Sequence, residues 1–341
     1  MIKRIALASV SALALAPMAA QADDCSLTIS VYAFAQDDFD RIVYQPFEDM
    51  TGCKIVVETG NSVERLAKIE ANRESPVIDM AVLATHDALG AANDGLLQPI
   101  DVSKLENYDK LYDIAKDPLG NHMAVGYTFY ATSIVYRTDK VDVTSWADLL
   151  SPELAGNVAF PDVTTNQGPP SLYMLGKALG SDDTSLDVPM TELGEHADDM
   201  VTFYVRSSQL AQLMQQEEIW AAPVGRFSWA QFKESGLPIA WATPKEGQTG
   251  GMNVMVMTAN NGNEELATKF MDFWLSTPVQ TALAEALVDS PANSEVTVSD
   301  EIADNLTYGA ETVNSLHLLP PEAMIANRDA WIEKWNNLVV K

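Results

Sequence analysis

Residues 124–136 of the chain read AVGYTFYATSIVY. The run is rich in aromatic and β-branched residues, among them Tyr127, Phe129 and Ile134, which favour strands. It is longer than an ordinary strand, which has about five or six residues. We therefore predict a strand that passes from one sheet to another. A second long β-type run, at residues 252–257, is predicted to be the return crossing.

The sequence before residue 124 alternates strands with helices. The predicted strands cover residues 27–34, 53–57 and 77–83, and the predicted helices cover 38–50, a segment with Ser62 as its N-cap, and 85–93. Pro46 predicts a kink or an early stop in the first helix. Three strand–helix units in a row predict a parallel α/β sheet with right-handed crossovers.

The two long runs divide the chain without a flexible linker between the parts. We predict an α/β fold of two lobes joined by two crossover strands at a hinge. Residues 23–130 form the first part of lobe 1, residues 131–250 form lobe 2, and residues 251–341 return to lobe 1 and add the C-terminal helices. Ligand sites in such folds lie at the carboxyl ends of strands and between lobes.

Composition limits the possible partners. The chain has 341 residues, 47% of them hydrophobic, and a formal net charge of −27. This hydrophobic content is enough for sizeable cores. The acidity argues against nucleic acid and anionic membranes, which attract basic surfaces. It fits either a cationic ligand or a surface adapted for solubility.

The first 22 residues have the pattern of a secretory signal peptide. Lys3 and Arg4 precede an apolar run at residues 5–16, and Ala20-Gln21-Ala22 is a small-x-small cleavage pattern. The run is too short for a membrane span. We expect an exported protein that begins at Asp23. In an oxidising compartment its two cysteines, Cys25 and Cys53, are expected to form a disulfide between the starts of two neighbouring strands, with two unbridged structural thiols as the alternative.

We find no catalytic motif. The chain lacks the G-x-S-x-G, G-x-x-x-x-G-K-[ST] and post-strand G-x-G-x-x-G patterns, and its four histidines are far apart in sequence. We expect no catalytic residue, no metal and no cofactor. An exported hydrolase with paired carboxylates is the alternative from another class of protein.

Polar loops follow several predicted strands. The candidate ligand-binding residues in these loops are Phe34, Gln36, Asp37, His86, Thr164, Thr165, Asn166, Arg226 and Asn253. Helix N-capping is the competing role for Asp37. The loop at 162–170 precedes a helix N-terminus, which suits a carboxylate or phosphonate. Arg226 suits a bidentate anion contact, with a surface ion pair as the alternative, and Gly250-Gly251 permits hinge motion.

Four stretches together resemble a known family. They are residues 45–55 (QPFEDMTGCKI), 144–149 (TSWADL), 241–247 (WATPKEG) and 127–136. The chain resembles the periplasmic solute-binding proteins of ABC importers, in the group of polyamine (spermidine/putrescine)-binding proteins. The resemblance implies a periplasmic, type II-like two-lobed clamp that closes on a small solute and docks on an inner-membrane permease, here as a monomer.

The group's site pattern is only partly present. Asp37 matches an acidic or polar position, whereas Ala35 and Gly251 stand where boxing tryptophans are expected, and Asn253 stands where the main acid is expected. His86 replaces a tyrosine, and Pro223-Val224 replaces another tryptophan. The resemblance implies a polyamine, while Arg226 and the 164–166 loop fit an anionic or zwitterionic solute such as an amino acid, opine or aminophosphonate, with Asp37 holding its amine.

Overall fold

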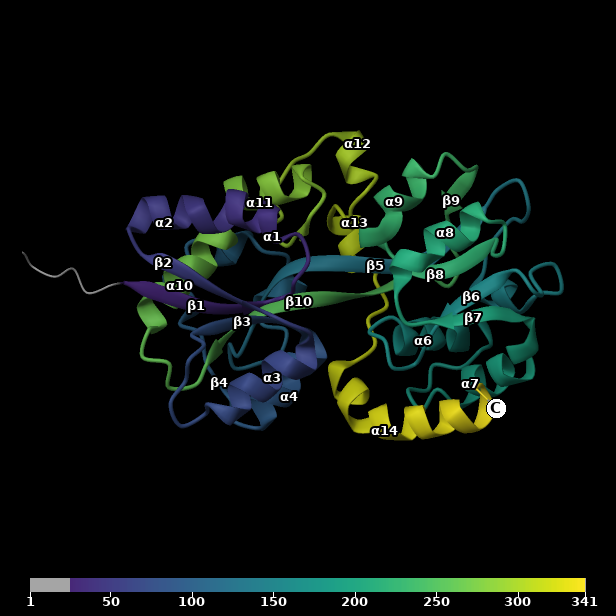
Figure 1. Cartoon of the computed structure of the whole chain (residues 1–341), viewed down its shortest axis with the longest axis horizontal. Helices are drawn as coiled ribbons and strands as arrows, with labels where there is room; N and C mark the ends of the chain where they lie inside the picture. The colour runs from purple at the N-terminus through teal and green to yellow at the C-terminus, as the bar shows by residue number, and fades with distance from the viewer. Residues whose placement is uncertain (1–24, 341) are drawn as a thin grey trace, which may run out of the picture.

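The computed structural model describes residues 25–340, and its central feature is one sheet that runs through the whole molecule (Figure 1). The main strand order is β2-β1-β3-β10-β5-β8-β6-β7. The two long strands, β5 (Val125–Arg137) and β10 (Thr249–Thr258), pair antiparallel at its centre. The predicted crossings are confirmed, but the two expected sheets are continuous because β5 and β10 bond to strands on both sides.

Lobe 1 contains a parallel three-stranded part with β1 in the middle. Its strands are β1 (Ser26–Val31), β2 (Lys54–Thr59) and β3 (Met80–Ala84). Its helices include α1 (Gln36–Phe39), the π-helical η1 (Asp40–Tyr44), α2 (Gln45–Thr51), α3 (Ser62–Ala71), α4 (Thr85–Asn93), α10 (Glu264–Trp274) and α11 (Thr277–Glu285). Shorter elements are β4 (Leu97–Gln98), η2 (Val102–Lys104), η3 (Tyr108–Lys110) and α5 (Asp113–Lys116).

Two local predictions in lobe 1 differ from the structure. Pro46 does not stop the first helix, and the predicted kink stays a prediction; the chain widens into the π segment η1, in which the Gln45 N–H donates to the Asp40 carbonyl. A proline has no N–H for the ordinary helical bond, and a π turn accommodates that loss. The N-cap of α3 is Asn61 rather than Ser62, because Asn61 and Glu64 form a reciprocal capping box.

Lobe 2 is built on the other half of the sheet. Its strands are β6 (Val158–Pro161), β7 (Met200–Tyr204), β8 (Ala221–Gly225) and β9 (Ile239–Trp241). Its helices include η4 (Trp146–Leu150), α6 (Gly168–Ala178), α7 (Asp187–Glu195), η5 (Ala197–Asp199), η6 (Ser207–Gln209), α8 (Leu210–Gln215), η7 (Arg226–Ser228) and α9 (Trp229–Glu234). Two clusters of buried side chains support this lobe, one around Trp146 and one around Phe232.

The C-terminal part contacts both lobes. It contains β11 (Ser290–Pro291), which pairs with β5, then α12 (Asp300–Ala303), α13 (Ala310–Asn314) and α14 (Pro321–Leu338). Trp331 and Trp335 of α14 belong to the lobe 2 core, and Figure 1 shows α14 running beneath lobe 2 from a start beside α4. Helix α14 therefore contacts both α4 of lobe 1 and α7 of lobe 2, and the predicted division into lobes stays a prediction.

The disulfide joins the starts of two adjacent strands. Cys25 and Cys53 are bonded, with a Cα–Cα distance of 4.6 Å, and the next residues, Ser26 and Lys54, are partners in the parallel pair β1–β2. The predicted disulfide is present. The predicted signal peptide lies outside the described residues. Within residues 25–340, no helix is both long and apolar enough to cross a membrane.

Candidate functional site

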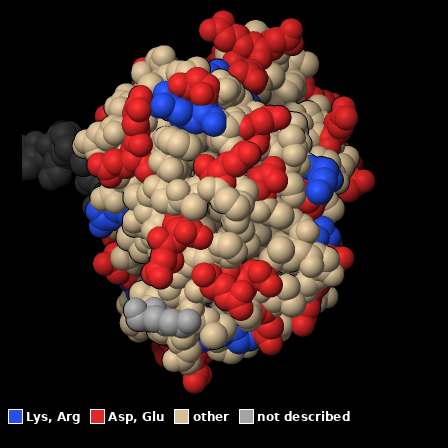
Figure 2. All heavy atoms as spheres, turned by 90° about the vertical axis from the view of Figure 1, so that its right-hand side faces the viewer, with Lys and Arg blue, Asp and Glu red and all other residues tan. Residues whose placement is uncertain are grey.

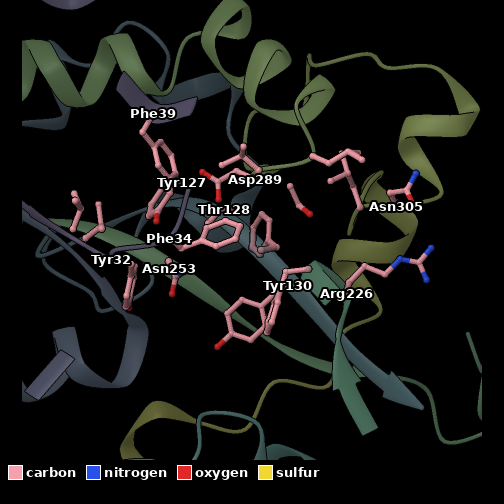
Figure 3. Close-up of a pocket in the computed structure, with 18 of the residues that line it drawn as sticks. Tyr32, Phe34, Phe39, Tyr127, Thr128, Tyr130, Arg226, Asn253, Asp289 and Asn305 are labelled. Carbon is pink, nitrogen blue, oxygen red and sulfur yellow. The ribbon is translucent and has the colours of Figure 1, made fainter. Parts of the chain in front are cut away.

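A cavity of about 380 Å³ lies where the two lobes meet, against the crossing strands (Figure 3). The end of β1, the middle of β5 and β10, and the segment after α11 contribute to its lobe 1 side. The start of α6 and η7 contribute from lobe 2. Its aromatic lining consists of Tyr32, Phe34, Phe39, Tyr127, Phe129, Tyr130, Phe227 and Trp274.

The aromatic walls are fixed mainly by packing in lobe 1. The rings of Phe39 and Tyr127 each lie 5.3 Å from the ring of Trp274 between centroids. Tyr32 carries the guanidinium of Arg65 at 4.3 Å from its ring centroid, and Arg65 is itself held by the Val82 carbonyl at 2.7 Å. Phe34, by contrast, is 57% exposed at the cavity rim. The walls therefore offer flat apolar faces of the kind that bind alkyl chains and organic cations.

Asp289 is the carboxylate among the described residues that line this cavity. It follows α11 and precedes β11, and the Thr128 side chain on β5 is near enough to lower its pKa. Its Oδ2 atom has no solvent access and no hydrogen-bond partner among the described residues. Burial raises the pKa of the Asp289 carboxyl to about 7, against a smaller lowering by the Thr128 side chain.

Arg226 lines the same cavity but uses its head group elsewhere. The guanidinium lies 4.6 Å from the ring centroid of Trp241 and 5.3 Å from that of Trp229. Its Nη2 donates to the Asp304 carbonyl oxygen, and the Asp304 Oδ1 atom is 3.6 Å away. Burial lowers the pKa of Arg226 to about 10, with the Asp304 charge acting in the opposite direction. The structure thus shows the ion pair considered as the alternative, and it joins lobe 2 to the segment after α12.

Tyr130 separates the main cavity from a second one of about 290 Å³. Tyr130 and Asn166 line both cavities. His86, at the start of α4, lines only the second, where its Nε2 atom is 3.6 Å from Asp87 Oδ1. Burial lowers the pKa of His86, while Asp87 acts to raise it. His86 and Asn253 therefore lie in different cavities.

The glycine pair at the return crossing has a packing role. A Cβ atom on Gly250 would overlap the Tyr130 carbonyl, and one on Gly251 would overlap the Tyr130 phenol ring. Both glycines are paired within the β10–β5 ladder, opposite Ala131 and Tyr130. Close approach of Tyr130 therefore explains these glycines directly, and the predicted hinge motion remains a prediction.

The loop between β6 and α6 uses its hydroxyls internally. Thr164 donates to Asp162 Oδ1 at 2.5 Å, and Thr165 donates to the Asp162 carbonyl at 2.8 Å. Both threonines line a shallow surface groove rather than the main cavity. Asn166 and Gln167 face the main cavity, and Gln167 Oε1 accepts the Gly225 N–H at 2.8 Å.

Gln36 and Asp37 lie beside the cavity without lining it. The Gln36 amide donates to the Tyr32 carbonyl at 2.6 Å and so holds the turn after β1. Asp37 is exposed in the first turn of α1. Of the nine candidate residues, the main cavity is lined by Phe34, Asn166, Arg226 and Asn253. Their ligand-binding roles stay predictions.

Sequence reasoning missed Asp289 and the tyrosines of β5 as candidate site residues. Asp289 follows a helix and precedes the two-residue strand β11, so a search for polar residues after long strands does not find it. The available signal was an acid between Val288 and Ser290 in an otherwise weakly charged stretch. In residues 25–340 no three His, Cys, Asp or Glu side chains are grouped as metal ligands.

Two α/β lobes, crossing strands and an aromatic cavity between them define a solute-binding protein of the periplasmic-binding-protein class. The chain belongs to the bacterial extracellular solute-binding proteins, whose family pattern matches residues 43–310. It is 29% identical over 321 residues to the spermidine/putrescine-binding periplasmic protein of Escherichia coli K12, covering 91% of each chain. It is 25% identical to a putative 2-aminoethylphosphonate-binding periplasmic protein of Salmonella typhi, covering 92% of each.

Solved structures agree with this assignment. A crystal structure described as an ABC transporter from Clostridium perfringens has a TM-score of 0.84 at 29% identity, covering 92% of this chain and 99% of that one. The chain is thus the substrate-binding component of an ABC transporter, a role exercised together with a membrane permease. Its relatives are periplasmic, which places the protein in the periplasm or outside the cell.

Proposed function

We propose that the cavity binds a small organic amine with a short aliphatic body, a class that includes the polyamines named for its relatives. The observation that carries this proposal is the cavity itself, whose flat aromatic walls surround a carboxyl group. Aromatic faces attract ammonium groups and cover methylene chains. Arg226 does not oppose an amine strongly, because its charge is offset by Asp304 and its head group stacks on Trp241.

A zwitterionic amine is the second candidate. Asp289 is the one acid in the described lining, so a second ammonium would meet amides rather than a carboxylate. On the lobe 2 side, Asn166 and Gln167 precede α6, whose N-terminus favours an anionic group. A molecule such as 4-aminobutanoate has one charge for each side of the cavity.

The wider role follows from the family. We propose that the protein is exported by its signal peptide, binds its solute as a monomer without chemical turnover, and does not bind nucleic acid. The acidic surface supports the last point: Figure 2 shows Asp and Glu side chains spread over the lobe 2 end, with Lys and Arg scattered between them. An acidic face repels polyanions.

Isothermal titration calorimetry of the mature protein tests the proposal. The ligands are putrescine, spermidine, 4-aminobutanoate, the uncharged analogue 1,4-butanediol and the dianion succinate. We expect at least one amine to bind at micromolar concentration, and 1,4-butanediol and succinate to bind more than tenfold more weakly. Preference for 4-aminobutanoate over putrescine would select the zwitterion. Tight binding of succinate with no amine binding would overturn the proposal, and turnover of any ligand would show an enzyme.

A further inference from the structure

We infer that Asp289 is the residue that binds the ammonium group of the solute and that selects amines over uncharged ligands. This inference rests on the proposed function, because it concerns the same cavity. Asp289 lies between α11 and the two-residue strand β11, not after a long strand. The inference also differs from the sequence-based expectation, in which Asp37 holds the amine.

Asp289 lies inside the aromatic part of the cavity. Figure 3 shows its carboxyl group beside Thr128, between the rings of Phe39 and Tyr127 and that of Phe34. Thr128 lies on β5, and the neighbouring Ser290 pairs with Phe129 on the same strand. The short strand β11 therefore anchors the residue next to Asp289 on the crossing strand β5.

The carboxyl group has unused hydrogen-bonding capacity. Its Oδ2 atom is buried and has no hydrogen-bond partner in the described structure. Buried polar atoms without partners are rare in native proteins and call for an explanation. An ammonium group brings three donors and a positive charge, so it would satisfy this carboxylate fully. Asn253, on the neighbouring β10, can contribute an amide oxygen to the same group.

The neighbouring titratable groups favour this role. Those in electrostatic reach are the phenols of Tyr44 on η1 and Tyr127 on β5, and burial raises the pKa of both, so they are neutral at pH 7. Arg226 lines the cavity from η7 but is paired with Asp304. In the described structure no cation neutralises Asp289 in the ligand-free site, so the solute can supply one.

Ammonium binding should therefore release a proton. The raised pKa of Asp289, about 7, means that much of the ligand-free protein carries a protonated carboxyl at and below neutral pH. An ammonium group favours the ionised form, so binding below pH 7 displaces that proton to solvent. Affinity for putrescine, whose amines stay protonated throughout, should fall about tenfold per pH unit below 7.

The test compares Asp289→Asn with the wild-type protein by calorimetry at pH 5.5, 6.5 and 8. Asparagine keeps the shape and the Thr128 contact but removes the charge. We expect the variant to lose at least about 30-fold in putrescine affinity at pH 8 and to lose the pH dependence. Asp40 is an exposed residue at the start of η1. Asp40→Asn is therefore the charge control and should bind putrescine as the wild type does.

The outcomes separate the two proposals. If the wild type binds no amine, the proposed function fails. If it binds putrescine and Asp289→Asn binds equally well, the inference about Asp289 is overturned while the function stands. A large loss in Asp37→Asn without a loss in Asp289→Asn would assign the amine to Asp37 instead. Proton release measured on the wild type, in buffers of different ionisation enthalpy, gives a readout that does not depend on any variant folding.

Discussion

The phenol ring of Tyr130 on β5 lies directly over Gly251 on β10, in the space that any Cβ atom at that position would occupy. Gly251 stands where the resemblance to polyamine-binding proteins predicts a tryptophan. Tyr130 thus places an aromatic ring at this position from the opposite crossing strand. Because Tyr130 lines both cavities, this contact sets where one cavity ends and the next begins.

Gly251→Ala should displace Tyr130 and disturb both cavities. We expect a loss of about 1–3 kcal/mol in unfolding free energy, the usual cost of overpacking, together with weaker ligand binding. Thermal unfolding and calorimetry measure the two effects. Gly90→Ala on α4 is the matched control, since its added methyl group would meet only Ile325 at 3.9 Å and should be tolerated. In a Tyr130→Ala background, Gly251→Ala should cost less stability than it does in the wild type, because the overlapping ring is gone. An equal cost in the wild type and in Tyr130→Ala would contradict the contact.

Reduction of the disulfide should destabilise lobe 1 without changing the site. The bond joins residues 28 positions apart and lies at the starts of β1 and β2, whereas the cavity lies at the end of β1. Closing a loop of that length is worth about 3–4 kcal/mol in the chain-entropy account. Urea unfolding of the wild type and of Cys25→Ser/Cys53→Ser measures the loss. Ligand affinity below the unfolding transition should be unchanged; a large affinity loss would connect the strand starts to the cavity.

The sequence predicted the fold well because its strongest signals are local. The long runs of β5 and β10 and the strand–helix units before them can be read from residue type and spacing alone. The π segment before Pro46 and the two-residue strand β11 could not, since both depend on tertiary packing. The same limit applies to α14, whose tryptophans do not indicate which lobe they contact.

The candidate site was predicted in part for a similar reason. The rule that ligands bind after parallel strands placed Phe34, Asn166 and Arg226 at the main cavity. It could not show that Arg226 is paired with Asp304, or that Gln36 is used by the turn after β1. The rule could not find Asp289, because this residue follows the helices α10 and α11 rather than a long strand.

Asp289 should make the stability of the ligand-free protein depend on pH. Its pKa is raised from the ordinary value of 3.8 to about 7, so the folded state binds a proton more tightly than the unfolded state does. The resulting stability is present below pH 4 and is lost as the pH rises to 7, by up to about 4 kcal/mol. Asp289→Asn should therefore be more stable than the wild type at pH 8, with a difference that shrinks towards pH 5. Urea unfolding at both pH values checks this; a constant difference would rule out the titration of Asp289 as its source.

Arg226 should act as a contact between the lobes rather than as a ligand-binding cation. In lobe 2, Arg226 and Lys233 both bind Asp304, which follows α12, with Lys233 Nζ 3.2 Å from its Oδ2 atom. If the guanidinium holds the two lobes together, Arg226→Ala should lower the affinities for putrescine and for 4-aminobutanoate by the same factor. It should also enlarge the radius of gyration of the ligand-free protein in small-angle X-ray scattering. If the guanidinium instead binds the carboxylate of the ligand, only the affinity for 4-aminobutanoate should fall. Lys233→Ala removes an exposed ion pair worth about 1 kcal/mol or less and should change neither measurement much, because the Arg226 contact to the Asp304 carbonyl remains.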